Sequence, residues 1–200
     1  MKKESKEKGL KKYRTLIILL ILAGIGILFY FYSTAKSSAR KGNTNVDISE
    51  VSKLLSKDLD KSYPDTPREV IRTYNRIITC YYGAKITEEE LNKLANMAQS
   101  LMDDELLERN PFDVYYSNLK EDISTYKSEK KTISSYILAN SYDVQYKTLQ
   151  GKQYAMLDCI YYTKSSAGTS RTIQRFTLRK DDAGRWKILY WSLAENEKDE

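Results

Sequence analysis

The chain has 200 residues, with 33 Lys and Arg, 27 Asp and Glu, two Cys and no His. The absence of His excludes His-ligated zinc and nucleophilic catalysis by a Ser-His-Asp or Cys-His system. Two Cys cannot build a zinc ribbon or an iron–sulfur site alone, and the sequence lacks the glycine-rich phosphate-binding motifs. We therefore expect no cofactor, no metal site and no familiar catalytic machinery.

The formal net charge of +6 arises in the N-terminal region. Residues 1–14 carry seven bases and two acids, and Lys36, Arg40 and Lys41 add three bases. Residues 43–200 carry 23 bases and 25 acids. Residues 43–200 are therefore slightly acidic. Binding to the phosphate backbone requires a surplus of basic residues, so we expect no nucleic-acid partner.

Residues 15–34 form an uncharged, apolar segment of twenty residues. A helix of that length spans about 30 Å, the thickness of the hydrocarbon core of a bilayer. Aromatic residues lie at both ends of the segment, as expected for the two membrane interfaces. The pattern predicts a transmembrane helix in the lipid bilayer, with the basic residues 1–14 in the cytoplasm and the C-terminal domain extracellular.

A cleaved signal peptide is the alternative for this segment, because Ser33, Thr34 and Ala35 resemble a cleavage site. The apolar run exceeds the usual 7 to 15 residues of a signal core, and bulky aromatics precede the small residues. These features favour an uncleaved, single-pass anchor at the cell membrane.

The next residues, 35–62, read as a linker that contains one short amphipathic helix. Residues 36–45 are polar and small, which is typical of a flexible tether. Ile48, Val51, Leu54, Leu55 and Leu59 then recur at helical spacing. We expect this helix to pack on the domain or to mediate self-association.

Three longer helices are predicted at the start of a domain spanning 63–195, with an acidic tail at 196–200. Thr66-Pro67-Arg68-Glu69 combines an N-cap, Pro at the first helical position and Glu at N3, and Gly83 ends that helix. Thr87 and Glu90 form a second capping box, for a helix that extends to about residue 106. Asn110-Pro111 starts the third helix, with an apolar stripe at 112, 115, 116, 119, 123 and 126.

After Lys131 the hydrophobic period changes to two, which predicts an antiparallel meander of four strands. The first strand is long and bulged near 139–140, and the others cover 154–163, 171–180 and 186–193. Symmetric turns pair Leu157 with Phe176 and Phe176 with Leu189. One face then collects the predicted core: Tyr142, Val144, Tyr146, Ala155, Leu157, Cys159, Tyr161, Phe176, Leu178, Leu189, Trp191 and Leu193.

This order of elements, with the segments TPREVIRTYNRIITCYYG and GRWKILYWSL, resembles the nuclear-transport-factor-2-like cone fold. The likeness covers about residues 64–195. It extends to membrane-tethered members: the outer domains of scaffold proteins of type IV secretion and Gram-positive conjugation machinery, and a family of clostridial single-pass proteins. The resemblance implies an α+β fold, with three helices on a curved four-stranded sheet around a pocket. It implies no catalytic residue.

The opposite face of the predicted sheet is the candidate for an interface with a protein partner or a second copy. Aromatic and Arg residues are enriched in protein interfaces. An ordinary solvated face, with Arg stems covering aromatic rings, is the alternative. The candidate residues are Arg171, Arg175, Arg179, Tyr154, Tyr162, Trp186 and Tyr190, and the register also places Asp158 beside Arg175.

Cys80 and Cys159 either form a disulfide, which an extracellular location permits, or remain two buried thiols. The acidic run Asp103, Asp104, Glu105 and Glu108 is expected to be a solvated helix face without a calcium site. The leading functional prediction is a non-catalytic binding or assembly domain. The alternatives are a small-ligand sensor or carrier that uses the cone pocket, and an isomerase-type enzyme.

Overall fold

The computed structural model describes residues 48–83 and 85–194. The chain divides into residues 1–42 and 43–200, and the described residues all belong to the second unit. Among the helices of this part, none has the length and apolar character needed to cross a bilayer. The predicted transmembrane helix at 15–34 and the acidic tail lie outside the described residues.

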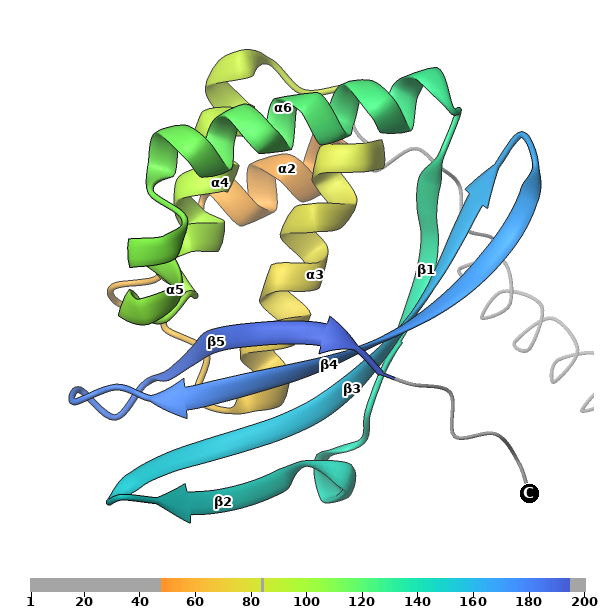
Figure 1. Ribbon diagram of the computed structural model, residues 1–200. Helices are drawn as coiled ribbons and strands as arrows, with labels where there is room; N and C mark the ends of the chain where they lie inside the picture. Colours follow the sequence, from red (N-terminus) through yellow and green to blue (C-terminus); the bar gives the residue numbers. More distant parts are fainter. Residues whose placement is uncertain (1–47, 84, 195–200) are drawn as a thin grey trace, which may run out of the picture. The chain divides into compact units, whose positions relative to one another are not determined.

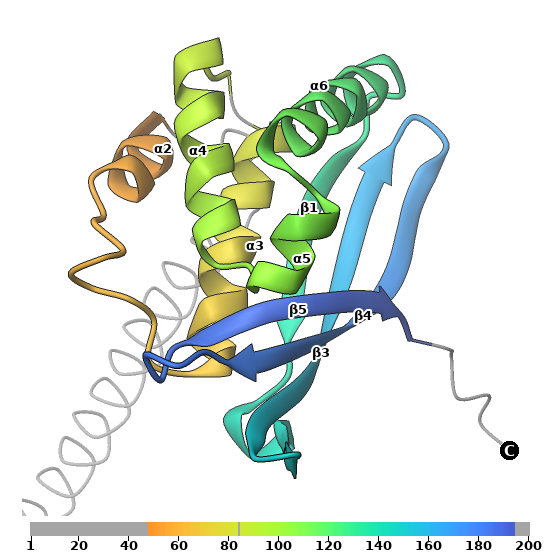
Figure 2. The same ribbon diagram turned by 60° about the vertical axis from the view of Figure 1, so that its left-hand side comes forward.

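The five helices of the described residues lie on one side of a strongly twisted sheet (Figure 1). They are α2 (Ile48–Leu55), α3 (Pro67–Gly83), α4 (Glu88–Ser100), α5 (Asp104–Arg109) and α6 (Phe112–Ser128). The sheet contains β1 (Thr132–Leu138), β2 (Gln145–Leu149), β3 (Lys152–Ser165), β4 (Gly168–Lys180) and β5 (Trp186–Leu193), and a 3-10 turn, η1 (Ser141–Asp143), precedes β2. Figure 2 shows the helix layer and the bent sheet from a second direction.

The predicted fold class is therefore wrong in its element counts, because the described sheet has five strands and the described helices number five. The long first strand of the prediction breaks at Asn140, which caps η1 together with Asp143. The two pieces, β1 and β2, pair with different halves of β3. All pairs of neighbouring strands in this sheet are antiparallel, in the order β1-β3-β4-β5 with β2 beside β3.

The second predicted helix ends early and a separate helix, α5, follows it. Thr87 and Glu90 form the predicted capping box of α4. At Met102 the chain instead pairs with Ile188 of β5, and Asp103 N–H donates to the Ile188 carbonyl at 2.8 Å. This pairing adds a short strand-like segment beside β5, which prevents one continuous helix. Asp103 then caps α5 by accepting a hydrogen bond from the Glu105 amide.

The short helix in the predicted linker, α2, belongs to the folded core. Val51 and Leu54 are fully buried against α3 and α4. Arg76 of α3 donates to Glu50 at 2.7 Å and joins the two helices. The stable domain therefore includes α2.

The predicted register is confirmed for β3 with β4, where Leu157 pairs with Phe176 and Asp158 pairs with Arg175. It is wrong for β5, because Phe176 pairs with Trp191 and Arg179 with Lys187. The 181–185 turn is one residue longer than a symmetric turn allows, and a bulge between Thr177 and Leu178 shifts the pairing again.

The shifted register changes which side chains form the core. Trp186 is buried, although the prediction placed it on the outer face, and Ile188, which is absent from the predicted core, is buried as well. Tyr142 and Leu193 were predicted in the core but are 84% and 70% exposed. The buried core lies between the helices and the apolar half of β3 and β4.

Candidate functional site

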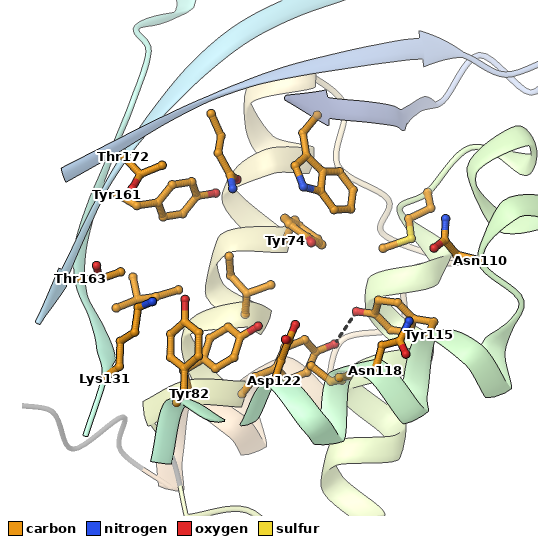
Figure 3. Close-up of a pocket in the computed structure, with 18 of the residues that line it drawn as sticks. Tyr74, Tyr82, Asn110, Tyr115, Asn118, Asp122, Lys131, Tyr161, Thr163 and Thr172 are labelled. Carbon is orange, nitrogen blue, oxygen red and sulfur yellow. Dashed lines mark hydrogen bonds between the residues drawn. The ribbon is translucent and has the colours of Figure 1, made fainter. Parts of the chain in front are cut away.

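The candidate site is a cavity of about 450 Å³ between α3, α6 and the helix-facing side of the sheet (Figure 3). Cavities of this size hold small ligands in known proteins. Asn118, Asp122 and Ser170 lie in its wall and are exposed, so the cavity opens to solvent. Figure 3 shows Tyr74 at its centre, with polar side chains arranged around it.

The helix-facing side of the sheet changes from apolar to polar along β3 and β4. At one end it carries buried Ala155, Leu157, Phe176 and Leu178. Because alternate residues of a strand share a face, the same face continues into the cavity. There it carries hydroxyl and amide groups, from Tyr161, Thr163, Ser170, Thr172 and Gln174. If these positions lay in a filled core, apolar residues would be expected, because buried polar groups without partners cost free energy. The polar residues are instead suited to contact water or a ligand.

Helix α6 continues this polar lining on the opposite side. Tyr115, Asn118, Asp122 and Tyr126 recur every three or four residues and all line the cavity. The sequence prediction treated the Tyr residues as part of an apolar core stripe. It missed Asn118 and Asp122. The only feature of the sequence that could have indicated them is their helical spacing from Tyr115 and Tyr126, which places them beside that stripe.

The cavity tyrosines are held by hydrogen bonds behind the wall. Tyr81 donates to the Leu94 carbonyl at 3.1 Å, and the Tyr115 hydroxyl lies 3.4 Å from that of Tyr81. Tyr161 donates to the side-chain oxygen of the buried Asn75. Burial raises the pKa of the Tyr81, Tyr115 and Tyr161 phenols above 10, so they stay protonated at neutral pH.

Two stacked rings form one edge of the cavity. The Tyr82 and Tyr126 ring centroids are 4.0 Å apart, and the Lys131 Nζ lies 4.8 Å from the Tyr126 centroid. Burial, and after it the negative charge of Asp122, raises the pKa of both phenols. An acid and a base therefore flank the same ring stack.

Trp191 of β5 completes the aromatic lining and is 37% exposed. Its ring centroid lies 5.8 Å from that of Tyr74 and 6.1 Å from that of Phe176. Phe176 is fully buried in the core, so its ring supports the Trp191 side of the cavity from behind. The predicted register also placed Trp191 on the helix-facing side, although with a different partner on β4.

The predicted outer-face residues do not form one exposed surface. Arg175 binds Asp158 through two hydrogen bonds of 2.7 and 2.8 Å, as expected, and Tyr162 pairs with Arg171. Tyr190 is also exposed. Trp186 is buried beneath the Lys180 ammonium, which corrects its assignment to the exposed candidate interface.

Arg179, another candidate interface residue, is engaged within the molecule. Its Nε donates to Asp103 Oδ2 at 3.0 Å, its Nη2 donates to Asp103 Oδ1, and Glu105 lies at 3.4 Å. Its strand neighbour across the sheet is Tyr154, which is half-buried. The Asp103 carboxylate raises the pKa of the Arg179 guanidinium. Asp103 is therefore buried and paired, which corrects its predicted place on a solvated helix face.

Cys80 and Cys159 are buried free thiols, so the disulfide considered from the sequence is not formed in this structure. Asn75 Nδ2 donates to Cys159 Sγ at 3.2 Å. Burial raises the pKa of the Cys80 thiol to about 11 and also raises that of Cys159. Neither thiol is in the reactive thiolate form at neutral pH.

The profile of the family described as Domain of unknown function (DUF6715) matches residues 1–191. The chain belongs to this family. No curated protein matches its sequence significantly. For this DUF6715 member, the functional argument therefore rests on the cavity itself.

Proposed function

We propose that this domain is a non-catalytic binding module whose ligand enters the cavity between α3, α6 and the sheet. The observation that carries the proposal is the change from apolar to polar residues along one face of β3 and β4. Polar groups in a cavity wall are bonded to water when the cavity is empty. A ligand with matching donors and acceptors can replace this water at little cost in free energy, whereas an apolar ligand would leave the groups unpaired. This favours the small-ligand alternative over a purely structural assembly role.

The chemistry of the cavity favours binding over catalysis. The chain has no His, and the described lining of the cavity contains one carboxylate, Asp122, which is exposed to solvent. The resemblance to the nuclear-transport-factor-2-like fold remains a prediction, and helices on one side of a bent sheet support it.

The cavity contains one of the two Trp residues of the chain, so binding is measurable by fluorescence. In full-length protein with Trp186→Phe, Trp191 is the only Trp. We expect the uncharged dye N-phenyl-1-naphthylamine to bind saturably, with energy transfer from Trp191. Thr172→Tyr narrows the cavity and is expected to weaken this binding at least about tenfold, because the new side chain occupies the space of the dye.

The matched control is Arg171→Tyr, which adds the same ring to the adjacent residue on the opposite face of β4. Its dye binding should equal that of the parent protein. Equal weakening by both changes, or dye binding that does not saturate, would show that the cavity is not the binding site.

The proposal places the domain outside the cell, where the sequence of residues 1–34 predicts it. These residues lie outside the described part of the chain, so the location rests on the sequence alone. Protease added to intact cells is expected to degrade the domain while a cytoplasmic marker protein stays intact. A domain that becomes digestible only after lysis would place it inside the cell.

A further inference from the structure

The groups that line the cavity are nearly all uncharged. Among the described residues that line it, Asp122 and Lys131 are the only acid and base, so this lining carries no net charge. Lys131 also lies on the Tyr126 ring and 3.9 Å from Glu129. An organic cation attracted by Asp122 would meet this ammonium beside the same ring stack, and an anion would meet Asp122. The charge pattern therefore favours a ligand without net charge.

The uncharged polar groups can both donate and accept hydrogen bonds. Within residues 48–83 and 85–194, the side chains of Asn118 and Gln174 form no hydrogen bond, so both ends of each amide are available to a ligand. Thr172 contributes a hydroxyl. Such a wall matches a ligand with many hydroxyl groups, each of which is a donor and an acceptor.

Aromatic rings alternate with these polar groups. Figure 3 shows Tyr74 and Tyr82 of α3, Tyr115 of α6 and Tyr161 of β3 directed into the cavity. Ring faces pack well against the apolar C–H face of a sugar ring, while its hydroxyl edge reaches amides and carboxylates. A flat apolar ligand would fill the same space but would displace water from the half-buried Gln174 amide without offering it a hydrogen-bond partner, which costs free energy.

We propose that the cavity binds a neutral saccharide of one or two units, stacked on the tyrosine rings and hydrogen-bonded through Asn118, Asp122 and Gln174. The inference rests on the proposed binding function and specifies its ligand class. The Asp122 carboxylate accepts from two adjacent sugar hydroxyls, and the two amides bind further hydroxyls across the cavity.

The test uses the full-length chain in a polyoxyethylene detergent, because detergents with maltoside or glucoside headgroups would compete for the cavity. The protein is applied to an array of neutral, anionic and cationic glycans, and neutral sugars that bind are then titrated against Trp191 fluorescence in the Trp186→Phe background. We expect saturable binding of at least one neutral mono- or disaccharide. Gln174→Leu should weaken it about fivefold to tenfold, because one amide is lost.

Gln145→Leu is the matched control, since Gln145 is exposed on β2 and does not line the cavity. It should bind the sugar like the parent protein. Dye binding without any neutral sugar binding at millimolar concentration, or tighter binding of charged glycans, would overturn the saccharide inference and leave the proposed function standing. Loss of saturable dye binding as well would overturn both.

Discussion

Replacing Phe176 with Ala is expected to lower the free energy of unfolding by about 3 to 5 kcal/mol, the range for truncation of a fully buried aromatic residue. Phe176 is fully buried and packs edge-on against Tyr74, with ring centroids 6.0 Å apart, and against Trp191. Removing its ring leaves a void behind the wall of the cavity. Urea unfolding of the full-length chain, followed by Trp fluorescence, measures the loss.

The control for this substitution is Tyr142→Ala. The sequence pattern placed Tyr142 and Phe176 on the same core face, but Tyr142 is 84% exposed. Its truncation should cost less than about 1 kcal/mol, because it removes little buried area. Similar losses for the two variants would contradict the observed sheet register and would favour the one predicted from the sequence.

Replacing Arg179 with Met is expected to cost about 2 to 3 kcal/mol, since it leaves the buried Asp103 carboxylate without its cation. The side chains of Asp103 and Arg179 are only 6% and 18% exposed. Asp103 also caps α5 and pairs with β5 through its backbone. The unpaired charge should therefore loosen α5 where it contacts the sheet.

Arg175→Met provides a matched control four residues away on the same strand. Arg175 binds Asp158 in a similar two-bonded geometry, but its side chain is 53% exposed. Solvent screening limits such a pair to less than about 1 kcal/mol. Equal losses for Arg175→Met and Arg179→Met in urea unfolding would show that burial of Asp103 is unimportant.

A second comparison separates the charge from the packing of Arg179. Adding Asp103→Asn to Arg179→Met removes the unpaired charge, and Asn still caps a helix well. The double variant is expected to be more stable than Arg179→Met alone. The absence of any gain in stability would mean that the unpaired Asp103 charge is not what destabilises Arg179→Met, and would assign the loss to the packing of the Arg179 stem.

The elements that the sequence predicted well are those specified by neighbouring residues. Helix α3 begins at Pro67 and ends at Gly83 as predicted, and α4 has the Thr87 and Glu90 capping box. The pairing of β3 with β4 also followed from the sequence, because their short turn is symmetric. In each case the decisive contacts join residues close in the sequence.

The elements that the sequence could not predict depend on distant contacts. Helix α5 exists because Met102 pairs with Ile188, which lies in the last strand. The β5 register depends on a bulge opposite Thr177, which no local residue type signals. For the same reason, Arg175 and Arg179 looked alike until the fold placed Asp103 beside only one of them.

The sequence by itself determined the charge distribution, the absence of His and most helix boundaries, since these follow from composition and local capping. The cavity could not be deduced in this way. The same Asn118, Asp122 and Gln174 would lie on an ordinary solvated surface if α6 or the sheet were rotated. Only the tertiary structure turns these polar side chains toward one space, because that depends on how α6 packs against the sheet.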